Sequence, residues 1–492
     1  MKKNKLLFTG SAWTEEKIMK TWKVIEKIAT EQHGLTFFQP QFEITDYDTM
    51  LINHSVTSGL PVIYSHWSQG RAYIAERDAY LNRQTGLAYE LILNSDPAIT
   101  YLMNSNSMPM MALVLAHAAV GHSSMFKNNF KFKEGVSPQY IVPFMSYARD
   151  YVELCEARYG ESSVCEILDA AHSIENQSMD YKKSRKVLDE YLQRINYNKE
   201  LERNYKEEYK DFDHKKTFED IDEGDLTGDR IILPESNLLY FIEKTSPTLQ
   251  KWEREILRIV RMKAQYFSPI RHTKLMHEGY ASFWHYILTN DLYDQGYIDE
   301  GAMLEILHSH TNVCCQQDMV QTYRMNPYKL GSEIFFDIKR MCLEPTKEDY
   351  EWFPDLAGSK DWHAAIQFAM ENFTDESFIL QYLSPAVVRK LGLMQLNFEE
   401  AIPYSRSDMY LVNSIQSNED FKKLRLDLST TYNVYYHTPL IQVVDYDTFD
   451  DVLHLKNINM FKHTLDVRTK REIEANIGML MGPSCEVYVS DY

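Results

Sequence analysis

Several histidine and glutamate side chains lie in otherwise apolar segments, and these are the residues whose types could carry out chemistry. They occur in three segments, AHAAVGHSSMFKNN, MHEGYASFWH and LHSHTNV. The residues are His117, His122, His277, Glu278, His285, His308 and His310. Burial of an ionisable side chain is costly unless the group is paired or bound to a metal. The pattern therefore indicates either a metal centre or a buried polar network, and both interpretations stay open.

The candidate metal ligands come from more than one predicted helix. They are His117, His122, Glu156 and His308. His117 and His122 are five residues apart, about 500° around an α-helix, so both reach one ion only if Gly121 relaxes the helix. Glu153 and Glu156 share a helix face because they are three residues apart. The HExxH motif is absent, so a divalent Zn, Fe or Mn ion is predicted from the clustering alone.

Glu278 is the candidate catalytic residue. Aromatic neighbours such as Phe283 and Trp284 favour an apolar surround, which raises the pKa of a carboxyl group and suits a general acid or base. The alternative is a carboxylate near the start of a helix, where the helix dipole stabilises its charge. Further candidates for the lining of a pocket are Glu153, His277, His285 and His310.

Charge and motifs argue against several classes of function. Lys plus Arg is 52 and Asp plus Glu is 71, so the net charge of −19 suits neither nucleic acid nor an anionic membrane as the main partner. The sequence contains no Walker loop, Rossmann fingerprint or GxSxG elbow. Six cysteines without a CxxC pair are too sparse for a disulfide framework, and no stretch approaches 18 apolar residues. We therefore expect a cytoplasmic protein without a transmembrane segment.

Apolar periodicity predicts a mainly helical body over residues 1–400. The predicted helices cover 14–33, 72–93, 108–126, 143–160, 162–195, 249–266, 273–290, 298–314, 327–342 and 361–372. Residues 196–230 interrupt this body with 7 Lys or Arg and 12 Asp or Glu, which indicates a solvated surface segment. Residues 405–492 are predicted to form a small α+β domain with the β-α-β-β-α-β order of a ferredoxin-like fold.

Ten segments, in order along the chain, resemble the SpoVR family (stage V sporulation protein R). They are PVIYSHWSQG (61–70), GLAYELILNSDPAITYLM (86–103), ALVLAHAAVGHSSMFKNN (112–129), YVELCEARYG (151–160), NLLYFIEKTSP (237–247), HEGYASFWHY (277–286), LHSHTNV (307–313), NPYKLG (326–331), WFPDLAG (352–358) and DESFILQYLSP (375–385). The resemblance covers about residues 15–400. The family pattern has Asn at the position of His277 and Trp at that of Tyr280. This departure weakens His277 as a ligand candidate and strengthens Glu278.

The resemblance implies a role in sporulation, specifically in formation of the spore cortex, a modified peptidoglycan layer. Relatives in bacteria that form no spores resemble partners of a serine-kinase stress system, so cortex assembly is not the whole activity. One hypothesis is a cytosolic metal-dependent enzyme, a hydrolase or amide-bond enzyme that acts on a cell-wall precursor. The alternative is a non-enzymatic regulator or scaffold in a sporulation or stress-kinase complex. Sporulation or stress-system proteins are the expected partners.

Overall fold

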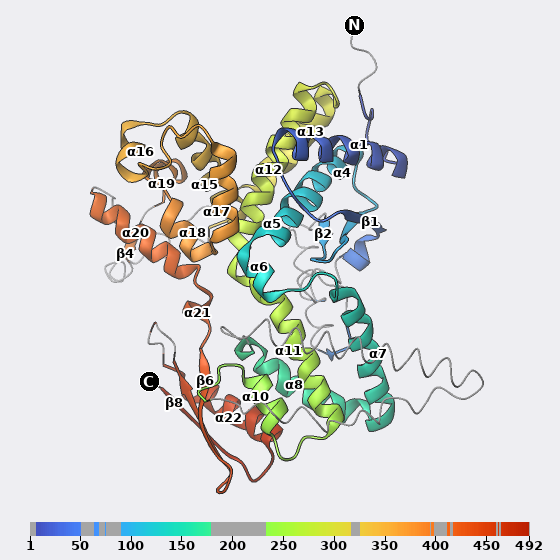
Figure 1. Ribbon diagram of the computed structural model, residues 1–492, viewed down its shortest axis with the longest axis vertical. Coiled ribbons are helices and arrows are strands. Elements are labelled where there is room, and N and C mark those ends of the chain that lie inside the picture. The colour runs from blue at the N-terminus through green and yellow to red at the C-terminus, as the bar shows by residue number, and fades with distance from the viewer. Residues whose placement is uncertain are drawn as a thin grey trace, which may run out of the picture. The chain divides into compact units, whose positions relative to one another are not determined.

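The chain divides into two compact units, each built from two stretches of sequence. The computed structural model describes residues 6–50, 63–67, 74, 90–178, 233–315, 325–393, 395–397, 411–413, 417–458, 461 and 464–491 (Figure 1). The predicted charged segment, 196–230, lies outside these residues. The first unit comprises Met1–Ser146 and Pro269–His437, and the second comprises Tyr147–Ser268 and Thr438–Tyr492. These limits differ from the predicted division into 1–400 and 405–492, because the chain leaves the first unit within one helix and returns to it within another.

The first unit is mainly helical, which confirms the predicted helical body. Its helices are α1 (Glu15–Lys27), η1 (Ile28–Gln32), α4 (Met108–Val114), η2 (Leu115–His122), α5 (Ser123–Asn128), α6 (Phe130–Gly135), α12 (Lys274–Asp294), α13 (Glu300–Val313), α15 (Pro327–Leu343), α16 (Lys347–Trp352), α17 (Trp362–Asn372), α18 (Asp375–Tyr382), α19 (Pro385–Leu391), α20 (Asn418–Thr431) and α21 (Val434–His437). Helices α7 (Ile141–Tyr159) and α11 (Lys251–His272) continue from one unit into the other.

Helix α12 packs between α15 on one side and the α4–η2–α5 segment on the other (Figure 1). At the crossing with α15, a Cβ atom on Gly279 would lie 2.4 Å from the Cα of Gly331, so both helices need glycine there. The first turn of α12 is held by Asp375, whose carboxylate accepts hydrogen bonds from the backbone N–H groups of Leu275 (2.8 Å) and Met276 (2.9 Å). These contacts fix the position of α12 within the first unit.

Helices α4, η2 and α5 form one continuous apolar helix, Met108–Asn128. The side chain of Ser107 caps its start by accepting a hydrogen bond from Met110 N (3.2 Å), and Pro109 fits the first turn because its missing N–H would have no partner there. The helix is long and apolar enough to span a membrane. However, 94% of its most apolar window is buried inside the fold, which is consistent with the core helix of a soluble protein.

The first unit also contains strands, and of these only the strand at 411–413 was predicted from the sequence. Residues 90–92 form a strand at the end of a predicted helix, 72–93, most of which lies outside the described residues. Strand β3 (Ala98–Met103) lies between β1 (Pro40–Thr45), to which it is parallel, and β2 (Glu90–Ile92), to which it is antiparallel. Strands β4 (Gln395–Asn397) and β5 (Leu411–Asn413) form a separate antiparallel pair. The parallel pairing of β1 with β3 joins residues far apart in the chain, and such non-local pairing leaves little local signal.

The second unit combines helices with a three-stranded sheet. Its elements are α8 (Glu161–Ser173), η3 (Glu175–Gln177), α10 (Leu238–Thr245), β6 (Ile441–Asp447), β7 (Val452–Asn457), α22 (Val467–Met481) and β8 (Glu486–Asp491). Strand β7 lies between β6, which is antiparallel to it, and β8, which is parallel. The small C-terminal α+β region and its order, β5-α20-β6-β7-α22-β8, are as predicted. The sheet has three strands rather than four, because β5 pairs with β4 and belongs to the first unit.

A buried ion-pair network joins α10 to α11 within the second unit. The Glu243 carboxylate accepts hydrogen bonds from Arg258 Nη2 (2.6 Å) and Arg261 Nη2 (2.9 Å). The Glu243 side chain is 1% exposed. Burial alone would raise the pKa of Glu243, but the two guanidinium groups outweigh burial and lower this pKa far below its usual range. The network keeps Glu243 ionised inside the unit.

Candidate metal centre

His117 and His122 lie on one face of their helix because η2 is a π-helix. In a π-helix each N–H bonds to the carbonyl five residues earlier, so residues five apart lie one above the other. The ring centroids of His117 and His122 are 4.6 Å apart. As predicted, the helix departs from α geometry here. The π geometry extends over Leu115–His122 and is not limited to Gly121.

Close packing of η2 against α12 brings Glu278 to the two histidines. A Cβ atom on Gly121 would lie 2.6 Å from the Cα of Ala281, so the two backbones approach as closely as glycine permits. Glu278 is three residues before Ala281 on α12 and therefore lies on the same side of that helix. Two small residues therefore allow the site to form. Gly121 is next to the ligand His122, and Ala281 is one helical turn after Glu278.

The ligand atoms of His117, His122 and Glu278 all lie within 4.8 Å of one another. Glu278 Oε2 is 3.7 Å from His117 Nε2 and 3.6 Å from His122 Nε2. The side chains are 3%, 7% and 17% exposed, respectively. Among the described residues, the buried Glu278 Oε2 has no hydrogen-bond partner. A cation bound by two imidazoles and this carboxylate would supply the missing partner, so the residues fit a metal ion.

The electrostatics favour metal binding over protonation. Burial lowers the pKa of His122, although the charge of Glu278 partly opposes this shift. Burial would raise the pKa of Glu278, but the neighbouring imidazoles, that of His117 first, lower it to about 2. The centre therefore combines a carboxylate with a neutral His122 imidazole, the protonation states that ligate a divalent cation.

Two further histidines extend the centre as a row of hydrogen-bonded rings. His117 Nδ1 lies 2.7 Å from His285 Nδ1, and His285 Nε2 lies 2.7 Å from His310 Nδ1. Burial lowers the pKa of His285 well below its ordinary value and that of His310 to about 4. His277 stacks on His122, with ring centroids 4.0 Å apart. Its pKa is also lowered by burial, and Nδ1 of His277 has no hydrogen-bond partner in the described part of the chain.

Three of the predicted ligands and pocket residues lie elsewhere. The His308 side chain is exposed, and its Nδ1 lies 3.4 Å from Asn312 Nδ2. His308 and His310 are two residues apart, about 200° around α13, so only one of them can face the core. Glu153 and Glu156 lie on the part of α7 that belongs to the second unit, with Glu153 exposed and Glu156 half-buried. The described centre contains none of the three.

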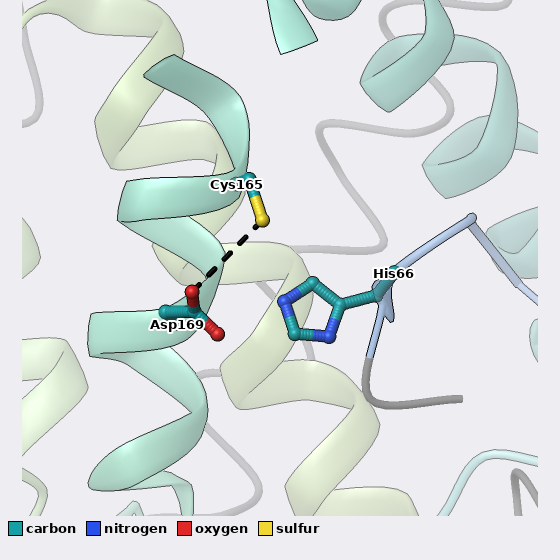
Figure 2. A group of neighbouring side chains, drawn as sticks. All are labelled: His66, Cys165 and Asp169. Atoms are coloured by element: carbon teal, nitrogen blue, oxygen red, sulfur yellow. Dashed lines mark hydrogen bonds between the residues drawn. The ribbon is translucent and has the colours of Figure 1, made fainter. Parts of the chain in front are cut away.

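A second pair of side chains with metal-ligand chemistry lies on α8 in the second unit. Figure 2 shows the Cys165 thiol directed at Asp169, with Sγ 3.9 Å from Oδ2. His66, drawn in the same figure, belongs to the first unit. Burial and the charge of Asp169 raise the pKa of Cys165, which keeps this sulfur protonated. Since a metal is bound by the thiolate, Cys165 and Asp169 alone make a poor metal site.

Comparisons with known proteins agree with the resemblance seen in the sequence. A family model described as "SpoVR like protein" matches residues 12–437. The uncharacterized protein YcgB of Escherichia coli (strain K12) is 38% identical over 482 residues, which cover 97% of this chain and 92% of the relative. No solved structure matches the chain significantly. The family match includes η2, α12 and α13, so the candidate metal centre lies in the part of the chain that matches the family.

Proposed function

Because this chain belongs to the SpoVR-like family, we propose that it is a sporulation-associated, metal-dependent enzyme whose ligands are His117, His122 and Glu278. Family membership supports the association with sporulation. The observation that carries the enzyme proposal is the convergence of two imidazoles and a carboxylate from η2 and α12. Three protein ligands leave at least one coordination position for water or substrate, as in catalytic rather than structural zinc sites.

The chemistry of such a centre would be hydrolytic. A divalent metal lowers the pKa of bound water towards about 7 and polarises a carbonyl oxygen. Glu278, first predicted as a general base, serves here as the anionic ligand, since its Oε2 faces both Nε2 atoms. His117 and His122 hold their ring positions because one bonds to His285 and the other stacks on His277. Such outer contacts orient metal ligands.

The finer assignment follows the family resemblance. We propose that the enzyme cleaves or forms an amide bond of a cell-wall precursor during formation of the spore cortex, in the cytoplasm and together with sporulation or stress-system proteins. The competing proposal is a regulator or scaffold without catalysis. Metal content distinguishes the enzyme from the scaffold in purified protein, because an enzyme of this kind needs stoichiometric metal.

Metal titration of purified full-length protein tests the proposal. The wild type should bind about one equivalent of Zn, Fe(II) or Mn. His122→Ala and Glu278→Ala should each lose most of the affinity, because two remaining ligands hold a divalent ion poorly. His308→Ala is the matched control, since this exposed histidine lies outside the centre. Wild-type protein that binds none of the three metals would favour the scaffold.

A further inference from the structure

A pocket of about 540 Å³ opens beside the far end of the histidine row, within the first unit. Its lining includes His310, Tyr286, Lys390, Glu333, Phe336 and Val387. His310 thus belongs both to the pocket lining and to the hydrogen-bonded row that begins at the metal ligand His117. The pocket itself is separate from the centre, because its lining includes none of His117, His122 and Glu278.

Each hydrogen bond in the row needs one donor and one acceptor, and a neutral imidazole supplies one of each. If His117 Nε2 ligates a metal, the hydrogen of His117 must be on Nδ1 and is donated to His285 Nδ1. The hydrogen of His285 is then on Nε2 and is donated to His310 Nδ1. His310 therefore carries its own hydrogen on Nε2 and is a donor at that atom.

Without a metal, the row can run in the opposite direction. His117 then carries its hydrogen on Nε2, the atom that faces the Glu278 carboxylate. His117 Nδ1 accepts from His285, whose Nε2 accepts from His310 Nδ1, and this leaves His310 Nε2 as an acceptor. The two states contain the same number of protons, because each ring carries one hydrogen in both and only the position of that hydrogen differs.

We propose that this row couples the two sites, so that a metal at His117 turns His310 Nε2 from an acceptor into a donor and the pocket then binds a small organic carboxylate. The inference rests on the proposed metal centre and adds to it the ligand class of a separate pocket. Lys390 provides the charge that a carboxylate needs, since its side chain is 62% exposed and an ammonium group has three donors. One of these donors bonds to Glu333 (2.6 Å).

The lining of the pocket agrees with an organic rather than an inorganic anion. Phe336 and Val387 supply apolar walls, which an inorganic ion cannot use. Glu333 accepts hydrogen bonds from both Lys329 (2.7 Å) and Lys390, so its charge is offset within the pocket wall. A small organic carboxylate would match both the polar and the apolar lining. Its carboxylate group would contact Lys390 and His310, and its apolar part would pack against Phe336.

Benzoate binding in the presence and absence of zinc tests the coupling. Calorimetric titration of full-length protein should show benzoate binding about three- to tenfold more tightly to the zinc-saturated form, the effect of one hydrogen bond gained. Benzoate should tighten zinc binding by the same factor, because linkage between two sites is reciprocal. Benzylamine, a probe of similar shape that offers no acceptor, should not gain affinity with zinc.

His285→Phe is the control variant, because it keeps a ring in the buried position and removes both nitrogens. In this variant, benzoate should bind with the same affinity to the zinc-saturated protein and to the zinc-free protein. Should this variant fail to fold, nitrogen-15 NMR of wild-type histidines gives the same information. Zinc should move the hydrogen of His310 from Nδ1 to Nε2, with the signal assigned by its loss in His310→Gln.

The outcomes separate this inference from the proposed function. Zinc-loaded protein that binds benzoate no better than the zinc-free form, or that does not bind it, overturns the coupling and leaves the metal centre intact. If zinc increases benzoate affinity equally in the wild type and in His285→Phe, the coupling through the row is overturned as well. The positive charge of the zinc ion alone would then explain the increase. Protein that binds no metal overturns both.

Discussion

His117 and His122 are five residues apart and present their rings on the same face of one helix, with centroids separated by 4.6 Å. An α-helix would turn the second ring about 140° away from the first, whereas the π-helix of Leu115–His122 aligns them. The backbone geometry of this one segment therefore decides whether the chain has a metal centre. This segment packs closely against α12 at Gly121 and Ala281.

Gly121→Ala should damage the centre without touching a ligand. The added Cβ would lie 2.6 Å from the Cα of Ala281, so η2 and α12 must move apart. We expect a loss of about 1–3 kcal/mol in the free energy of unfolding, as for other overpacked cores. Zinc affinity should fall at least about tenfold, because ligand spacing is critical at bond lengths of about 2.0–2.2 Å.

Gly301→Ala is the matched control for this substitution. Gly301 lies in the first turn of α13, where the nearest contact of an added Cβ is Asp299 Oδ1 at 3.5 Å. Alanine there should leave zinc affinity unchanged and stabilise the protein by up to about 1 kcal/mol, since alanine favours helices over glycine. A Gly121→Ala protein with wild-type zinc affinity would contradict the role given to the close approach. Urea unfolding and zinc titration give the two measurements.

The predictions from sequence were best where local pattern decides structure. The apolar surroundings of His117, His122 and Glu278 marked them as candidates, and the three side chains do lie together. The long helices were predicted because their apolar periodicity is strong. Tertiary contacts decided the rest. Gly121 in η2 packs against Ala281, a residue 160 positions later in the chain, and no local pattern encodes that contact.

The misplaced candidates share the same cause. Glu153 and Glu156 share a helix face, as predicted from their spacing, but spacing along one helix does not determine which unit that helix segment joins. His308 could have been set aside from sequence, because His310 is two residues away and faces the opposite side of α13. The pocket residues Lys390 and Glu333 gave no signal, since single charged residues are common on helices.

Glu243→Gln should strongly destabilise the second unit. The carboxylate pairs with Arg258 and Arg261, whose side chains are 9% and 3% exposed. The change therefore leaves Arg261 without this counter-charge and Arg258 paired with Glu255 alone. Removing one partner of a buried pair costs about 3–5 kcal/mol. Asp150→Asn serves as the control, since the Arg149–Asp150 pair is exposed and contributes less than about 1 kcal/mol. Similar urea midpoints for the two variants would refute the prediction.

His272 should make the protein less stable as the pH falls below about 6.5. Burial, together with the charges of Lys131 and Arg271, lowers the pKa of His272 from 6.5 to about 4. Between these two pH values the unfolded chain binds a proton that the folded chain does not. The free energy of unfolding therefore falls with falling pH, by up to about 1.4 kcal/mol per pH unit.

The variant His272→Gln should remove this contribution. Urea unfolding should show a shallower loss of stability between pH 6.5 and 4 in the variant than in the wild type. Between pH 7 and 8 the free energy of unfolding should depend on pH equally in the two proteins, because His272 is neutral in both the folded and the unfolded state there. Identical slopes from pH 6.5 to 4 would show that burial does not suppress the protonation of His272.

X-ray absorption at the edge of the bound metal tests the central claim most directly. For zinc-loaded full-length protein we predict a first shell of nitrogen and oxygen atoms at about 2.0–2.2 Å, with the outer-shell scattering of two imidazole rings. His122→Ala should reduce the imidazole count to one, and His308→Ala should leave it at two. A sulfur shell near about 2.3 Å, or an imidazole count that His122→Ala does not change, would contradict a centre built from His117, His122 and Glu278.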